Sequence, residues 1–166
     1  MNKISLYIAT SFFIIFATNI SAGDIAKGKE KSITCIACHG QDGISVSPIW
    51  PKLAGQHKSY LTSQLHEFKK GPEGKRNNAI MYGISVALSD EDIDDLSAYY
   101  ESLDKSIGTT ADDSFELGQN IYRGGNMEYK IQACIACHGP NGDGNGPASM
   151  PVLSGQHAEY IYSQLK

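Results

Sequence analysis

The chain contains 166 residues, of which 41% are apolar and 19% are charged. That balance excludes a disordered tail, a collagen-like repeat and a polytopic membrane protein, and the length suffices for one ordinary domain or two small ones. The formal net charge is −4, so we expect no broad electrostatic surface for nucleic acid.

Residues 1–22 have the pattern of a secretory signal peptide. One lysine precedes an apolar run over residues 4–16, and a patch of small residues follows at 21–23. An uncleaved membrane anchor is the alternative, but polar residues interrupt the run and it is short for crossing a bilayer. We predict export from the cytoplasm and cleavage after Ala22 or Gly23.

The remainder of the chain is an internal repeat. The sequence CIACHG occupies residues 35–40 and again residues 134–139. Further on, residues 51–65 read PKLAGQHKSYLTSQL and residues 151–165 read PVLSGQHAEYIYSQL. A match of this length indicates duplication and predicts two units of similar plan.

The first unit, residues 23–105, has the pattern of a small all-α domain. Three helices are predicted, over residues 24–34, 60–70 and 89–103. The third has a clear start, because Ser89 followed three residues later by Asp92 fits a capping box. The intervening loops are rich in Gly, Pro, Ser and Asn, and no strand pattern of any length is present. The polar stretch that follows separates this unit from the second, residues 106–166.

The four cysteines lie in two Cys-x-x-Cys-His runs: Cys35, Cys38 and His39, then Cys134, Cys137 and His138. This run is the covalent attachment motif of c-type haem. Two thiols three residues apart on a helical turn can add across the two vinyl groups of the porphyrin, and the next residue brings an imidazole beneath the iron. Units of this size also bury too little apolar surface to be stable without a cross-link such as a disulfide, a metal or a covalent cofactor. We therefore predict two covalently attached haem groups, with His39 and His138 as iron ligands.

Three other interpretations of the cysteines are weaker. A zinc site needs four converging ligands, and the two pairs lie 99 residues apart in separate units. A thiol redox motif is typical of one pair near a βαβ pattern rather than two pairs each followed by histidine. Disulfides within each pair would close loops too small to stabilise much.

Met81 is the candidate for the sixth iron position in the first unit. It is the only methionine of that unit and lies in a stretch, residues 77–83, that we expect to be a loop. Ligation by histidine and methionine raises the reduction potential and suits an electron carrier. The alternative is a packing methionine beside five-coordinate iron. His57 and its repeat His157 are the other possible ligands, although a hydrogen-bonding role is favoured for both.

Two CxACHG motifs, each followed by P-x-L-x-G-Q-H-x-x-Y, behind a secretion signal, resemble the dihaem cytochrome c4 family. The resemblance implies an all-α fold of two tandem class I cytochrome c domains around covalent haem. By analogy, the Pro51 carbonyl would accept the Nδ1 proton of His39 and Leu53 would pack on the haem face, with Pro151 and Leu153 as their counterparts. Gly28 would allow close contact with Tyr99 and Tyr100.

The family also implies a function. It suggests a periplasmic one-electron carrier, not an enzyme, that receives electrons from a cytochrome bc-type complex, passes them to a terminal oxidase and sometimes associates loosely with the membrane. No small-molecule substrate is expected. The alternatives are a cytochrome subunit of a larger dehydrogenase, such as a sulfide-oxidising flavoprotein, and a dihaem peroxidase.

The second unit departs from the first in its length. Only 28 residues follow His138, so the counterparts of the distal methionine and the closing helix fall beyond Lys166. We expect an incomplete chain whose second domain lacks its closing helix. The alternative is a functional truncation that leaves an iron open, or capped by Met127, Met150 or His157.

Overall fold

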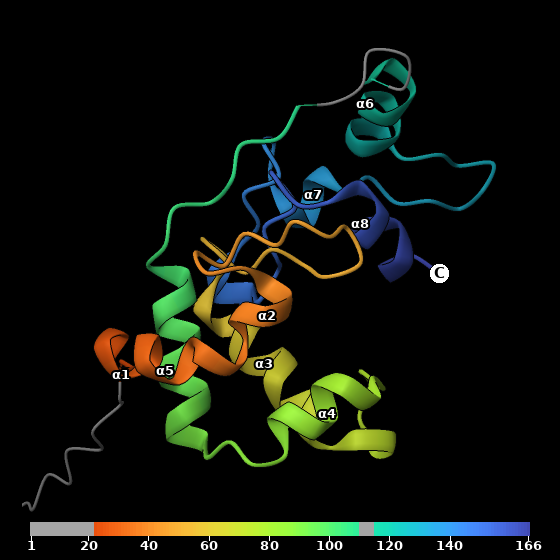
Figure 1. Cartoon of the computed structure of the whole chain (residues 1–166). Coiled ribbons are helices and arrows are strands. Elements are labelled where there is room, and N and C mark those ends of the chain that lie inside the picture. The colour runs from red at the N-terminus through yellow and green to blue at the C-terminus, as the bar shows by residue number, and fades with distance from the viewer. Residues whose placement is uncertain (1–21, 110–114) are drawn as a thin grey trace, which may run out of the picture.

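The computed structural model describes residues 22–109 and 115–166, so nearly all of the predicted signal peptide lies outside the described residues. The first repeat contains α1 (Ile25–Lys31), α2 (Ile36–His39), α3 (Lys58–Lys69), α4 (Ala79–Ser85) and α5 (Asp90–Glu101), and the second contains α6 (Phe115–Gly124), α7 (Ile135–His138) and α8 (Ala158–Gln164) (Figure 1). Within the described ranges only two isolated β-bridges and no strands occur. The expectation of an all-α fold is confirmed.

Three 3-10 turns complete these elements, namely η1 (Ser32–Thr34), η2 (Gly71–Glu73) and η3 (Gly146–Ala148). No helix in the part of the chain described here combines the length and apolar character needed to cross a membrane.

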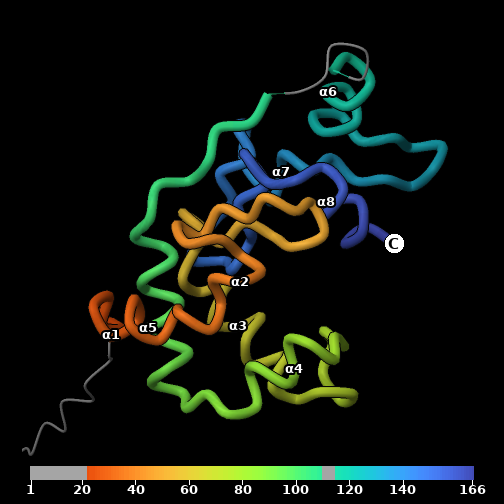
Figure 2. The backbone as a smooth tube through the Cα atoms, in the orientation of Figure 1, coloured from red at the N-terminus to blue at the C-terminus, as the bar shows by residue number. Residues whose placement is uncertain are grey.

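Helix α1 crosses α5 at very close range, as the tube in Figure 2 shows. A Cβ atom on Gly28 would lie 2.1 Å from the backbone oxygen of Asp95 and 2.7 Å from the Cβ of Tyr99. Only glycine tolerates such an approach of two backbones. The expected contact of Gly28 with Tyr99 is therefore present, and the backbone of Asp95 comes closer still.

Helix α5 begins as predicted and buries one face. The Ser89 hydroxyl accepts a hydrogen bond from the Asp92 amide at 3.1 Å, and the Asp92 carboxylate accepts one from the Ser89 amide at 2.8 Å. Ile93 is fully buried, and Leu96 and Tyr100 are nearly so. The core of the first repeat gathers around this face and contains Leu61, Leu96, Tyr99 and Tyr100, with Cys35 and Leu53 packed against it.

The expectation of a loop around Met81 is wrong. Residues 79–85 form α4, because the side chain of Asn78 accepts hydrogen bonds from the amides of Ile80 at 3.1 Å and Met81 at 3.0 Å. Asparagine is a favoured N-cap residue. The polar stretch that precedes Met81 therefore starts a helix rather than continuing a loop.

Helix α6 of the second repeat lies apart from the other helices (Figure 1). Its residues Phe115 and Leu117 are 49% and 68% exposed. A Cβ atom on Gly118, the counterpart of Gly28, would meet no atom within 4 Å. Among the described residues, α6 therefore lacks the close contact that α5 gives to α1.

The buried carboxylate of Asp95 connects α5 to both ends of α1. Asp95, 1% exposed, accepts hydrogen bonds from the Asp24 amide at 2.7 Å and from the Lys31 ammonium at 2.8 Å. Burial works against the ionisation of Asp95, but Lys31 and the Asp24 amide outweigh it and hold the pKa of this carboxyl below its usual value. Lys31 also pairs with Asp92 at 2.7 Å and, together with Ser89, lowers the pKa of Asp92.

The lowered pKa values predict an acid-sensitive fold. Carboxylates with a depressed pKa stabilise the folded state above the pKa of the unfolded chain, about 4, and lose that contribution as the pH falls further. The melting temperature should therefore be level near pH 6 and fall below about pH 4, and Asp95→Asn should lower it at pH 6 and make the fall shallower. Glu91→Gln, which removes a 65% exposed carboxylate on the same helix, should change neither. Equal melting curves for Asp95→Asn and the parent would contradict this assignment.

Candidate functional site

The first candidate site is a pocket whose walls come from three separate parts of the chain. Its lining residues are Thr34, Cys35, Cys38, His39, Trp50, Ile80, Met81 and Ile84. Cys35 and His39 occupy the two ends of α2, where the His39 amide donates to the Cys35 carbonyl at 2.9 Å. One helical turn thus places both thiols and the imidazole on the same wall, and α4 supplies Met81 to the pocket.

The imidazole of His39 is held in one tautomer. Its Nδ1 lies 2.8 Å from the carbonyl oxygen of Pro51. A carbonyl can only accept, so Nδ1 carries the proton and Nε2 keeps its lone pair. His39 is 5% exposed, and this burial lowers its pKa against the opposing effect of the Pro51 bond. The side chain is therefore a neutral imidazole with a free Nε2, the form that ligates metals.

The second repeat reproduces this arrangement. The Nδ1 of His138, at the end of α7, lies 2.9 Å from the carbonyl oxygen of Pro151. In both repeats the leucine two residues after the proline donates its amide to a glycine carbonyl, at 2.7 Å for Leu53 and 2.8 Å for Leu153. The two histidines are thus positioned by the same backbone geometry.

These residues fit a haem. The thiols of Cys35, Cys38, Cys134 and Cys137 form no disulfide bonds. In residues 22–109 and 115–166, no three or more His, Cys, Asp or Glu side chains gather into a site for a metal ion. A porphyrin brings four nitrogen ligands of its own and needs only axial ligands from the protein. A neutral histidine beside two free thiols and an apolar wall meets that need.

Two glutamines join the repeats by reciprocal hydrogen bonds. The side chain of Gln56 accepts from the Val152 amide at 2.8 Å and donates to the Val152 carbonyl at 3.1 Å. The side chain of Gln156 makes the same pair with Lys52, at 3.0 Å and 2.9 Å. Because Val152 and Lys52 are themselves equivalent positions, the interface has an approximate twofold symmetry.

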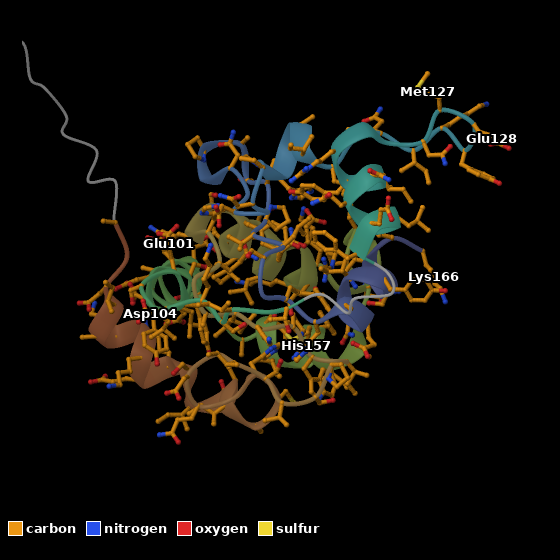
Figure 3. All side chains as sticks on the ribbon, turned by 90° about the horizontal axis from the view of Figure 1, so that it is seen from above. Glu101, Asp104, Met127, Glu128, His157 and Lys166 are labelled. Carbon is orange, nitrogen blue, oxygen red and sulfur yellow. The ribbon has the colours of Figure 1, made fainter. Side chains whose placement is uncertain are left out.

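The hydrogen-bonding role favoured for His57 and His157 is confirmed, and their partners lie in the opposite repeat. His57 Nε2 is 2.8 Å from the Asp143 carbonyl, and His157 Nε2 is 3.0 Å from the Ser45 carbonyl. Both nitrogens therefore donate a proton and are not available to iron in this arrangement. Figure 3 shows His157 in the body of the molecule and Met127, 90% exposed, on a projecting loop.

The sequence does not predict several of the residues that line the pocket. Ile80 and Ile84 stand four residues apart on α4 and share the pocket with Met81. This spacing is typical of one face of a helix, but it does not predict a shared wall if the stretch is expected to be a loop. For Trp50, the only indication in the sequence is its position directly before Pro51.

Comparison with known proteins identifies the fold and its cofactor. A profile of the cytochrome c family matches residues 25–104 and 115–166. Cytochrome c4 of Azotobacter vinelandii is 44% identical over 151 residues, which cover 87% of this chain and 72% of that protein. The chain belongs to the dihaem cytochrome c4 family. Like the family, it consists of tandem class I cytochrome c domains, carries two covalently attached haem c groups and transfers electrons.

Two further comparisons bear on structure and context. The crystal structure of reduced recombinant cytochrome c4 from Pseudomonas stutzeri matches with a TM-score of 0.83 and 43% identity, over 87% of this chain and 79% of that one. The thiosulfate dehydrogenase electron acceptor of Stutzerimonas stutzeri is 37% identical over 138 residues, or 81% of this chain and 62% of that protein.

The reciprocal glutamines should contribute measurably to stability. Gln56→Ala leaves the buried amide and carbonyl of Val152 without partners, which costs about 1–3 kcal/mol for each unpaired group. With two such groups, we expect the free energy of unfolding, measured in urea, to fall by at least roughly 2 kcal/mol. Gln41→Ala, at an exposed glutamine of the same repeat, should leave it unchanged, and an equally stable Gln56→Ala protein would contradict the interface.

Proposed function

We propose that this cytochrome is a periplasmic carrier of single electrons that accepts them from a cytochrome bc-type complex and delivers them to a terminal oxidase. The observation that carries the proposal is the repeated site, in which a neutral histidine held by a proline carbonyl stands beside two thiols in each unit. Haem iron supplies one-electron redox chemistry when bound there. The reciprocal contacts of Gln56 and Gln156 keep the two sites at a fixed separation.

We assign the residues of each site as follows. Cys35 and Cys38 form the thioethers of the first haem, and Cys134 and Cys137 those of the second. His39 and His138 are the proximal iron ligands, oriented by Pro51 and Pro151, while Leu53 and Leu153 pack against the haem faces. Met81 is the distal ligand of the first iron.

The assignment of Met81 rests on its position. It lines the same pocket as His39 but comes from α4, on a separate stretch of chain. The Met81 thioether would hold the haem iron from that side of the pocket and would leave no open site for a substrate. Electron transfer through the haem edge, rather than chemistry at the metal, then remains as the function of this site.

The boundaries of the processed protein follow from the sequence pattern. We propose that residues 1–22 are a cleaved signal peptide, that residues 23–105 form the first domain and that residues 106–166 belong to the second. The formal charge of residues 23–166 is −5, from 13 basic and 18 acidic groups. Any peripheral association with a membrane would then depend on a partner protein rather than on attraction to acidic lipid.

A second candidate is the role of electron acceptor for a dehydrogenase. The similarity to the thiosulfate dehydrogenase electron acceptor of Stutzerimonas stutzeri favours it. In that role the same two haem groups would receive electrons from an enzyme that oxidises a sulfur compound. The two functions differ in the donor and leave the site assignments unchanged.

Replacement of Met81 tests the distal ligand. Met81→Ala should abolish the thioether-to-iron charge-transfer band of the oxidised protein and lower the reduction potential of one haem, because loss of the thioether favours oxidised iron. Met127→Ala, at a 90% exposed methionine, serves as the control and should preserve both. An unchanged band and potential in Met81→Ala would overturn the assignment.

Electron donors distinguish the two candidate functions. The oxidised protein is mixed in a stopped-flow instrument with a purified bc-type complex and quinol, or with a thiosulfate dehydrogenase and thiosulfate. The proposed function predicts fast reduction by the first donor and reoxidation by a terminal oxidase. Fast reduction by the dehydrogenase alone would replace it with the second candidate.

A further inference from the structure

The segment that leads into α4 is anchored to α3 of its own repeat. The Lys75 amide donates a hydrogen bond to the Glu67 carboxylate at 2.8 Å. The guanidinium of Arg76 donates to the Gln64 side chain at 2.9 Å and lies over the ring of Phe68, 4.9 Å from its centroid. All three partners belong to α3, so this helix holds the approach to α4.

A further contact of Arg76 reaches the second repeat. Its Nη2 donates a hydrogen bond to the hydroxyl of Tyr160 at 3.0 Å, across 84 residues of sequence. Tyr160 lies on α8 and is the repeat counterpart of Tyr60 on α3. Burial works against the charge of Arg76, but its contacts with Tyr160 and Tyr60 outweigh this and raise the pKa of the guanidinium. The approach to α4 is thus held by both repeats.

The position of Arg76 bears directly on Met81. Arg76 lies two residues before Asn78 and five before Met81. The Asn78 side chain accepts hydrogen bonds from the amides of Ile80 and Met81, so this cap fixes the first turn of α4, the turn that carries Met81. A short stretch of chain therefore connects the contact with the second repeat to the candidate iron ligand of the first.

We propose that Tyr160 acts, through Arg76, as a positioning residue for Met81. The inference rests on the proposed function, in which Met81 is the distal ligand of the first iron. The bond between Arg76 and Tyr160 exists only while the approach to α4 keeps its observed position. It therefore stabilises this position over any in which Met81 has moved away, and the second repeat keeps the first iron closed to other ligands.

Binding of imidazole to the oxidised, haem-loaded protein measures how readily Met81 leaves the iron. Imidazole binds where Met81 has moved away, so its apparent affinity rises with the fraction of molecules in that state. Tyr160→Phe removes only the hydroxyl to which Arg76 donates. We expect the imidazole concentration that halves the thioether-to-iron band to fall about tenfold, as loss of a hydrogen bond to a charged group implies, and the α4 amides to exchange hydrogen faster. Unchanged imidazole binding would overturn the proposal.

Two controls separate this effect from a general loosening of the molecule. Tyr162→Phe removes a hydroxyl from a 61% exposed tyrosine of α8. Ser59→Ala removes a different bond between the repeats, from the Ser59 hydroxyl to the Gly146 carbonyl at 2.6 Å. Neither variant should change the imidazole concentration. If Ser59→Ala had the same effect as Tyr160→Phe, the interface as a whole would be responsible and the proposal would be wrong.

A double variant tests whether Tyr160 acts through Arg76. Once Arg76→Gln has removed the guanidinium, adding Tyr160→Phe should lower the imidazole concentration no further, and additive effects would overturn the proposal. The thioether-to-iron band separates this failure from that of the proposed function. If Met81→Ala kept the band, the proposed function and this inference would both be contradicted. If Met81→Ala lost the band while Tyr160→Phe bound imidazole like the parent, the inference alone would fall.

Discussion

Each repeat is so small that it buries too little apolar surface to be stable on its own, and the rest of the structure depends on this constraint. The largest side chains in the core of the first repeat cluster at Leu61, Leu96, Tyr99 and Tyr100, and its helices run from 4 to 12 residues. Domains of this size usually need a covalent or metal staple. The walls that carry the thiols and Met81 enclose one pocket, so a haem placed there ties α2, α4 and the Trp50 segment together.

The orientation of the histidines is preserved where the rest of the loop is not. His39 and Pro51 are 12 residues apart and His138 and Pro151 are 13 apart, yet the Nδ1 to oxygen distances are 2.8 Å and 2.9 Å. The extra residue is accommodated in the loop before Pro151, where Ser149 takes a left-handed conformation and Asn145 bridges to Met150. The two loops therefore follow different paths, but the proline carbonyl at the end of each loop holds the imidazole in the same way.

Structural features that depend on neighbouring residues can be predicted from the sequence, whereas contacts between the repeats cannot. The capping box at Ser89 and the Cys-x-x-Cys-His turns depend on neighbouring residues and were predicted correctly in their structure. Helix α4 was missed because Asn78 acts equally well as a loop residue and as a cap. The partner of Gln56 is the backbone of Val152, 96 residues away. The duplicated motif draws attention to Gln56, but it does not indicate which residue this side chain contacts.

The most direct test of this account is the fold of the chain with and without haem. Far-ultraviolet circular dichroism and thermal melting would be compared for the exported protein and for a variant in which all four motif cysteines are alanine. If haem holds each repeat together, the exported protein is helical and melts cooperatively, and the cysteine-free variant loses both properties. A variant that remained helical and melted cooperatively without covalent haem would contradict it.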